Sequence, residues 1–514
     1  MRRTEVDLPL VLDRRDPRPL TIQVADGIRE LIDGGVLRPG ERLPATRPLA
    51  RRWGVARGTV VAGIDQLLAE GYLTAVIGAG TVVNPRLTTV HPGLPHPKGG
   101  EPGRPSRAQG DATRTTHAGP GPSPEPSRRV DLSHGRPDTA RLVDPRWRDA
   151  WRTAASSMSA DAPPAAGLAA LRTELAAHLR QVRGVLADPA DILATTGARD
   201  GLAMVLRCES LRRGRPLTVA VEDPGYPTLR RVPQRLGATL VEVPVDGDGM
   251  DLDALRAVSP TPDLVIVTPS HQYPLGHSMS AARRHGLLAW AGGSGALIVE
   301  DDYDSELRYV GAPLPALAAL DRQLAPEGRM VVTLGSFART VTGDLGAGFL
   351  YAPRALIGDL VALRADLGGL PSGVLQRALA SYLRSGGLRL HIERMRRDYR
   401  RRRLHLLESL GSLPGAEVSC MDGGLHAVVH LDAVGHESAE RRERRVVEAA
   451  ADRGILVTPL SRYWAHARPT TAYGIVIGYP VPGESGETAL ATLRDVIAST
   501  SPGQSVSLPP GSGH

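Results

Sequence analysis

A segment rich in proline, glycine, serine and threonine at residues 85–129 divides this 514-residue sequence into two parts that must fold separately. The segment contains ten prolines and hardly any large apolar residue in a periodic array. It therefore buries too little apolar surface to offset the entropy of ordering it, and its prolines make it a semi-rigid spacer. We expect a small domain at 1–84, a disordered linker at 85–129 and a large domain at 130–500. Residues 501–514 have a similar composition and are predicted to form a disordered tail.

The basic residues are unevenly placed and almost all of one kind. The net charge is +7, of which residues 1–84 supply +2 and residues 85–129 supply +4. This excess near the N-terminal end favours an anionic partner there. Of the 62 basic residues, 61 are arginine, and Lys98 in the linker segment is the single lysine. A mechanism that needs a lysine inside a folded domain is therefore excluded, unless Lys98 serves.

The overall composition favours a cytoplasmic protein. The apolar runs are far shorter than the roughly 20 residues that span a bilayer, and the first ten residues lack the apolar core of a secretory signal. The two cysteines, Cys208 and Cys420, are too few for a disulfide scaffold or a cysteine-based zinc site. His271 and His277 have no further clustered ligands, so no metal site is expected.

The N-terminal part has the pattern of a winged helix-turn-helix. Amphipathic spacing predicts helices over 20–33, Thr46–Trp53 and Arg57–Glu70, followed by two short strands, Tyr72–Val76 and Gly80–Val83. Between the first helix and the middle of the third, one acid accompanies six arginines, which are Arg38, Arg42, Arg47, Arg51, Arg52 and Arg57. Such a charge pattern fits DNA binding, and it also fits a solvated arginine face.

The large part alternates between helical and strand-like patterns, which favours an α/β domain with a mostly parallel sheet. The expected strands are Pro216–Val221, Thr239–Val243, Asp263–Val267, Ala296–Val299 and Met330–Leu334. Ligands of such sheets bind at the carboxyl ends of the strands. Polar clusters stand at three such places, Thr195–Ala198, Asp301–Tyr303 and Gly335–Phe337, although each alone is only weakly specific. A basic helix near 388–406 is interpreted as a solvated face rather than a second nucleic-acid surface.

Residues 19–83 resemble the GntR-type winged helix along their whole length. The segments LRPGERLPATRPLA and LLAEGYL, with the later GAGT, are specific in combination. The resemblance implies DNA contacts at Arg47, Arg57, Gly58, Thr59 and Gly78. One departure is Ala56, where the family usually has a serine that caps the recognition helix.

Residues 130–498 resemble the fold-type I domain of aminotransferases that use pyridoxal phosphate. The segments TTGARDGL, VEDPGYP, TPSHQYPLG, VEDDYDSELRY and LGSFART occur in family order, and their union with a GntR head resembles the MocR family of regulators. In that family the domain holds pyridoxal 5′-phosphate. The resemblance implies cofactor contacts at Gly197, Ala198, Arg199, Tyr226, Asp301, Tyr303, Ser336 and Arg339.

Four departures from the family pattern affect this cofactor. The lysine that binds it covalently is replaced by Arg339, and the arginine seven positions later is replaced by Gly346. The tyrosine of the Y-x-D-P-x-G segment is missing, and residues 469–493 contain no arginine for a substrate carboxylate. Because a guanidinium stays protonated and cannot form an imine, covalent binding is not expected. Non-covalent binding of pyridoxal phosphate, a different anionic ligand and a purely structural domain all remain open.

We therefore expect a homodimeric transcriptional regulator that binds double-stranded operator DNA and is not an enzyme. Its aminotransferase-like domain is expected to dimerise and to sense a ligand. Two alternatives are an aminotransferase tethered to DNA, which Arg339 disfavours, and a ligand-free architectural DNA-binding dimer.

Overall fold

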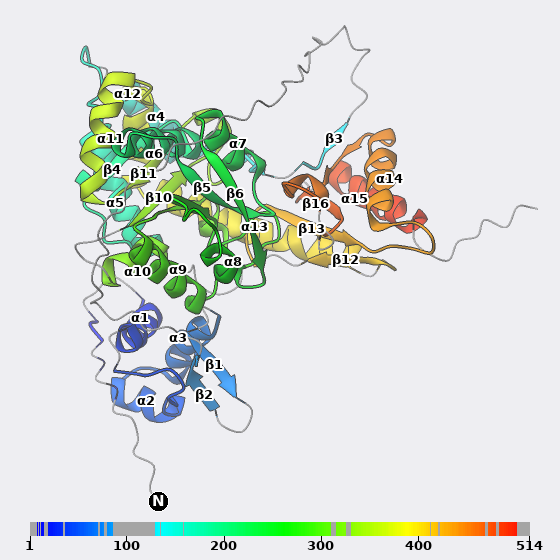
Figure 1. The fold of residues 1–514 in the computed structure, drawn as a ribbon, viewed down its shortest axis with the longest axis horizontal. Helices are drawn as coiled ribbons and strands as arrows, with labels where there is room; N and C mark the ends of the chain where they lie inside the picture. The colour runs from blue at the N-terminus through cyan, green and yellow to red at the C-terminus, as the bar shows by residue number, and fades with distance from the viewer. Residues whose placement is uncertain are drawn as a thin grey trace, which may run out of the picture.

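The computed structural model describes residues 8, 10, 12–14, 19–33, 36–69, 72–76, 80–85, 129–133, 135–157, 159–309, 315–324, 330–411, 413–419, 422–467, 471–479 and 483–500. Apart from its two end residues, the predicted linker lies outside these residues, as does the predicted tail. Figure 1 shows an N-terminal head, a large domain above it and a smaller domain at one side. No helix in the described ranges is both long and apolar enough to cross a membrane.

The head has the predicted winged helix-turn-helix fold. Its elements are α1 (Leu20–Asp33), α2 (Thr46–Trp53), α3 (Arg57–Ala69), β1 (Leu73–Val76) and β2 (Gly80–Val83). The helix α2 ends at Gly54, whose φ of 63° is in the left-handed region that favours glycine. Helices α1 and α3 cross closely at Gly63, where a Cβ atom would lie 2.8 Å from Cγ1 of Val24. The strands β1 and β2 pair as an antiparallel hairpin, which forms the wing.

Within the described residues, eight strands form the large sheet, and most of them are parallel. In spatial order they are β4 (Ile192–Thr195), β11 (Gly348–Tyr351), β10 (Val331–Ser336), β9 (Leu297–Asp302), β8 (Leu264–Val267), β5 (Thr218–Asp223), β6 (Thr239–Asp246) and β7 (Gly249–Met250). Strands β11 and β7 run antiparallel to their neighbours. The five strands predicted from sequence are β5, β6, β8, β9 and β10, and they are mutually parallel.

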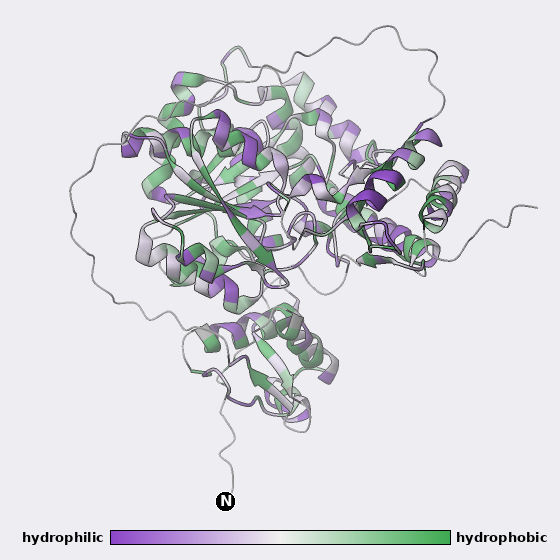
Figure 2. Cartoon of the chain, turned by 45° about the vertical axis from the view of Figure 1, so that its right-hand side comes forward, coloured by the Kyte–Doolittle hydropathy of each residue, from purple (hydrophilic) through white to green (hydrophobic). Residues whose placement is uncertain are grey.

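Both faces of this sheet are covered, because alternate residues of each strand contribute to different cores. In β8, Leu264 and Ile266 belong to one buried cluster, whereas Val265 and Val267 belong to the other. The first face packs on α6 (Ala198–Arg213), α7 (Pro227–Arg235) and α11 (Arg354–Leu367). The second packs on α8 (Leu252–Arg256), α9 (Ala281–Ser294) and α10 (Leu317–Leu324). Figure 2 shows the hydrophobic strands enclosed between helices with more hydrophilic outer surfaces.

Further helices join the large sheet to the smaller domain. Helix α12 (Gly373–Arg384) packs on α4 (Pro145–Ser156) and α5 (Ala169–Arg183) and leads to the long helix α13 (Gly387–Leu410). Short 3₁₀ helices lie at Pro189–Asp191, Ser305–Leu307, Gly343–Leu345 and Leu460–Tyr463.

The smaller domain has its own antiparallel sheet, which the sequence analysis did not separate from the large one. Its strands are β12 (Ala416–Ser419), β13 (His426–Leu431), β16 (Gly474–Gly478) and β15 (Thr458–Pro459), and its helices are α14 (Ala439–Asp452) and α15 (Glu484–Ser499). Strand β3 (Val130–Asp131) pairs with β14 (Ile455–Leu456), so the start of the region 130–500 joins its end. No linker-like composition marks this internal boundary, which explains why the sequence pattern does not show it.

The uncapped start of α3 gives a first prediction. Ala56 occupies the N-cap position, where its carbonyl oxygen accepts from the amide of Thr59 over 3.0 Å but its side chain offers no acceptor to the first turn. The substitution Ala56→Ser is expected to stabilise the head by about 1 kcal/mol, because the serine hydroxyl adds an acceptor for the amides of Gly58 and Thr59 in the first turn. Chemical denaturation of the full chain, followed by a signal that reports on the head, measures this change in the free energy of unfolding. The matched control Ala62→Ser, at an exposed position inside α3, is expected to destabilise it slightly.

Candidate functional site

The first candidate site is the exposed surface of α2 and the start of α3. Arg47, Arg57 and Gly58 are exposed and Thr59 is half-buried, so four of the five predicted DNA-contact residues lie together. The fifth, Gly78, lies outside the described residues. The Nε atom of Arg57 donates a hydrogen bond to Oγ1 of Thr46 over 3.3 Å, which orients the guanidinium beside α2.

More arginines surround this surface than the motif comparison indicated. Arg51 and Arg52 of α2 are exposed, as are Arg38 and Arg42 in the segment before α2, and Arg42 bridges Val82 of the wing. Arg14 was not predicted, yet its Nη2 atom donates to the carbonyl oxygen of Gly54 over 2.7 Å and places a further charge beside the turn. Its only sequence signal was the basic character of the N-terminal segment. A convex basic surface at a helix-turn-helix can neutralise phosphates and present side chains to base edges.

The second candidate site is a cavity of about 850 Å³ at the carboxyl edge of the large sheet. The structure brings all eight predicted cofactor residues to its lining, namely Gly197, Ala198, Arg199, Tyr226, Asp301, Tyr303, Ser336 and Arg339. They come from the ends of β9 and β10 and from the N-termini of α6 and α7. The cavity therefore lies where the strand ends converge, as expected for a sheet of this type.

The start of α6 forms a cradle of backbone amides. Gly197 precedes the helix with a φ of 139°, and a Cβ atom placed there would meet no atom within 4 Å. Asp200 fixes the turn by accepting from the amide of Thr196 over 2.9 Å and pairing with Arg364 over 2.8 Å. The first amides of a helix attract anions, and the exposed Arg199 adds a positive charge.

Asp301 is a buried carboxyl whose hydrogen bonds are incomplete. It is 7% exposed, and within the described part of the chain no group donates to its Oδ1 atom. Burial raises the pKa of Asp301 to about 7, and the nearby Asp302 acts in the same direction, whereas Arg339 opposes the shift. An unsatisfied buried oxygen that lines a cavity indicates a missing partner, such as the ring nitrogen of a ligand.

A second buried carboxyl, Glu222, was missed by the sequence analysis. Its oxygens accept from Oγ1 of Thr268 over 2.5 Å and from the amide of Thr268 over 3.1 Å. Burial raises the pKa of Glu222 to about 7, while these hydrogen bonds oppose the shift. Its signal was the acid at the end of a strand-like run in the segment VEDPGYP, which could equally have been exposed.

Tyrosines form the wall between the cavity and the smaller domain. Tyr273, also missed, contacts Tyr226 edge to face, with ring centroids 5.4 Å apart. Its hydroxyl donates to that of Tyr463 over 3.1 Å. The hydroxyl of Tyr303 donates to the carbonyl oxygen of His271 over 2.9 Å, so it is already engaged within the protein. Val476 of β16 is buried in the same cluster, so the last strand of the smaller sheet contributes an apolar side chain to this wall.

Arg339 spans the cavity instead of leaving room for a lysine-linked cofactor. Its side chain is half-buried, and its Nη1 atom donates to the carbonyl oxygen of Gly135, in the segment that follows β3. The guanidinium therefore connects the end of β10 to a segment 204 positions earlier. Gly346, seven positions on, supplies no side chain toward the cavity.

Other residues that the sequence singled out pair with acidic side chains of the protein. In α13, Arg394 pairs with Asp144 over 2.8 Å and Arg402 pairs with Asp138, so these two arginines support the fold. His271 pairs with Asp304 over 3.0 Å. In the ranges that the structure describes, no group of three or more histidine, cysteine or acidic side chains could hold a metal ion.

The two buried carboxyls give a prediction about pH. Both pKa values are raised in the folded state, so the stability that their neutral forms contribute is lost as pH rises through about 7. The melting temperature of the ligand-free protein is expected to fall between about pH 5 and about pH 8. Glu222→Gln and Asp301→Asn are each expected to flatten this fall. Asp253→Asn, which changes a carboxyl that is 92% exposed, serves as the control, and an equally flat profile for it would refute the assignment.

Both parts of the chain are similar to known proteins. Residues 20–83 match the family model "Bacterial regulatory proteins, gntR family". The multiple substrate aminotransferase from Thermococcus profundus has a TM-score of 0.63 at 22% identity, over 73% of this chain and 93% of that one. The kynurenine aminotransferase from Pyrococcus horikoshii, solved with PMP and substrates, has a TM-score of 0.62 at 22% identity, over 73% of this chain and 91% of that one. These likenesses show the fold of the large and smaller domains.

Two relatives that match most of the chain are regulators. The pyridoxine biosynthesis transcriptional regulator PdxR of Corynebacterium glutamicum is 40% identical over 96% of this chain and 98% of its own length. The probable rhizopine catabolism regulatory protein MocR of Rhizobium meliloti is 32% identical over 91% of this chain and 92% of its own length. With its gntR-type head and aminotransferase-like fold, the chain belongs to the MocR and PdxR type of DNA-binding transcriptional regulators.

Proposed function

We propose that the aminotransferase-like domain of this regulator binds a small anionic ligand non-covalently and carries out no transamination. The observation that carries the proposal is Arg339, which spans the cavity at the position where the resembling family has its lysine. The single lysine of the sequence, Lys98, stands in the predicted linker segment at 85–129. Without an amine that can lose its proton, the domain has no group for imine formation or for the proton transfers of transamination.

The charges around the cavity favour an anion. Arg199 and Arg339 line it, together with the amides at the start of α6. A phosphate or carboxylate bound there would receive charge-assisted hydrogen bonds. Tyrosines and the buried Asp301 also line the cavity, so a ligand with an anionic end and a planar ring suits its lining.

Pyridoxal 5′-phosphate, when bound, would supply a phosphate and a pyridine ring to these residues. The open cradle at Gly197 fits its phosphate, Tyr226 offers a ring to stack on, and the unsatisfied oxygen of Asp301 fits the ring nitrogen. Arg339 does not fit a covalent link to the cofactor. The cavity is therefore proposed to bind the cofactor, or a similar anion, without a covalent bond.

The head is proposed to bind operator DNA through Arg47, Arg57, Gly58 and Thr59, and the full chain is proposed to act as a homodimer. A dimer presents two heads, which suits two half-sites of one operator. Because this function requires access to chromosomal DNA, it favours the cytoplasmic location expected from the sequence. The boundaries at 1–84, 85–129, 130–500 and 501–514 remain predictions.

The DNA contact can be tested at Arg57. Arg57→Ala is expected to weaken operator binding by about 1–3 kcal/mol and to relax base preference at one position of each half-site. Binding isotherms at several salt concentrations measure both the affinity and the number of phosphate contacts. The control is Arg494→Ala, an exposed arginine of α15, which should leave the affinity unchanged. Equal affinities for wild type and Arg57→Ala would contradict the assigned interface.

The ligand site can be tested by titration with pyridoxal 5′-phosphate. The wild type is expected to show saturable thermal stabilisation with no covalent adduct after borohydride treatment, as judged by mass. Asp301→Ala should lose the stabilisation. Arg339→Lys restores an amine at the end of β10 and is expected to yield the adduct. Transamination by the wild-type protein would overturn the assignment as a non-enzyme, and the absence of any stabilisation would leave other anions as the ligand class to titrate.

A further inference from the structure

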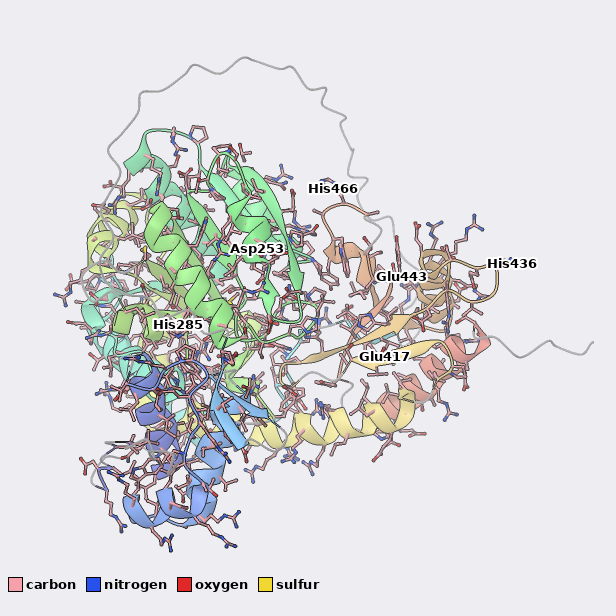
Figure 3. All side chains as sticks on the ribbon, turned by 60° about the horizontal axis from the view of Figure 1, so that its bottom comes forward. Asp253, His285, Glu417, His436, Glu443 and His466 are labelled. Carbon is pink, nitrogen blue, oxygen red and sulfur yellow. The ribbon has the colours of Figure 1, made fainter. Side chains whose placement is uncertain are left out.

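The head contacts the large domain through a buried polar pair. Tyr72, between α3 and β1, is 2% exposed, and His285 of α9 is 3% exposed. The hydroxyl of Tyr72 lies 3.1 Å from Nε2 of His285, and the two rings meet edge to face with centroids 5.7 Å apart. Arg29 of α1 lies over the ring of Tyr72, with its Cζ atom 5.5 Å from the centroid. Figure 3 labels His285 on the side of the large domain that faces the head.

This contact leaves the DNA-contact residues free. Arg57 begins α3, whereas Tyr72 follows its end, and thirteen helical residues at 1.5 Å each separate the two by about 20 Å. Arg47 and Arg57 remain exposed while Tyr72 is buried. In Figure 1, α1 lies next to α9 and α10, whereas α2 lies at the far side of the head. The contact therefore fixes the orientation of the head without covering its basic surface.

Arg284, which precedes His285 in α9, is hydrogen-bonded to the segment that forms part of the cavity wall. Arg284 is 3% exposed and donates to the carbonyl oxygens of Pro269 over 2.7 Å, Met279 over 2.9 Å and Pro315 over 2.9 Å. Pro269 and Met279 belong to the segment between β8 and α9, which also carries the cavity residues Thr268 and Tyr273.

The other end of α9 also leads to the cavity. After α9 the chain enters β9, whose carboxyl end carries Asp301 and continues to Tyr303. Consecutive residues of a helix point about 100° apart, so Arg284 and His285 can contact different neighbours while sharing one rigid backbone. A displacement of the cavity wall therefore has a direct route to the contact with the head.

We propose that α9 couples the ligand cavity to the head, with Arg284 as its attachment to the cavity and His285 as its attachment to Tyr72. The proposal rests on the ligand-binding function proposed above. A ligand that displaces the segment 268–279 changes the position of α9 and therefore the stability of the docked head. The ligand acts on DNA binding only through its different affinities for the docked and undocked arrangements.

Hydrogen exchange of the full chain tests the docking itself. Tyr72→Phe removes only the hydroxyl, and His285→Leu removes the ring nitrogens, whereas His436→Leu at an exposed position serves as the control. Without ligand or DNA, both test variants are expected to exchange about tenfold faster than wild type at 72–76, with His436→Leu unchanged. Unchanged exchange in both test variants would show that the pair does not hold the head.

The coupling is tested from the cavity side with Arg284→Lys, which keeps the charge but replaces the planar guanidinium, whose three nitrogens each donate to a different carbonyl group, with a single nitrogen. Faster exchange at 72–76 is expected in this variant, with the melting temperature confirming a folded domain. If the folded variant exchanges like wild type at 72–76, the route through α9 is overturned. If Arg284→Lys does not fold, Arg284→Gln replaces it and is judged by the same exchange. Neither variant depends on any ligand.

Pyridoxal 5′-phosphate provides the third comparison. If the compound raises the melting temperature, we expect it to change the operator affinity of the wild type. In His285→Leu we expect the compound still to raise the melting temperature but no longer to change the operator affinity. An unchanged effect in His285→Leu would refute the coupling. Failure of the compound to stabilise any variant would count against the proposed ligand and not against the α9 route, which the Arg284 substitutions decide.

Discussion

The parallel strands β5, β8, β9 and β10 all end at one edge of the large sheet, and the cavity and the docking of the head both depend on that alignment. Asp301 lies near the end of β9 and Ser336 at the end of β10, while Thr268 directly follows β8. Helices on both faces hold these strands, because successive side chains enter different cores. Since α9 connects β8 to β9, the surface that receives the head is built from the same unit as the cavity wall.

The cavity lies at the strand ends of an aminotransferase-like fold, and arginine, tyrosine and carboxyl side chains line it. Two buried carboxyls, Glu222 and Asp301, have raised pKa values because of burial, and the positive charge of Arg339 acts in the opposite direction on Asp301. A lysine in that place could lose its proton and attack a carbonyl group, whereas a guanidinium keeps its charge and donates hydrogen bonds. The contact of Arg339 with Gly135 further fixes the segment after β3 as part of the cavity lining.

Local patterns in the sequence predicted the elements well and the long-range contacts poorly. Helix α2 has the predicted bounds, because Thr46–Trp53 is amphipathic and Gly54 ends it in a left-handed conformation. The family motifs indicated the cavity residues, since strand ends of one sheet converge. The pair of Tyr72 and His285 joins positions 213 apart, and neither residue stands in a pattern that indicates a partner. The second sheet was also missed, because helices and strands alternate across both sheets without a break in composition.

Because the pKa of Asp301 is raised to about 7, a ligand that binds beside it changes its protonation, and this proton exchange contributes to the measured heat of binding. A phosphate or carboxylate placed beside Asp301 favours its neutral form and takes up a proton, whereas a protonated ring nitrogen favours the carboxylate and releases one. Calorimetric enthalpies in two buffers differ by the number of protons exchanged multiplied by the difference between the ionisation heats of the buffers. The sign of that difference therefore reveals which end of a bound molecule faces Asp301, even before its chemical identity is known.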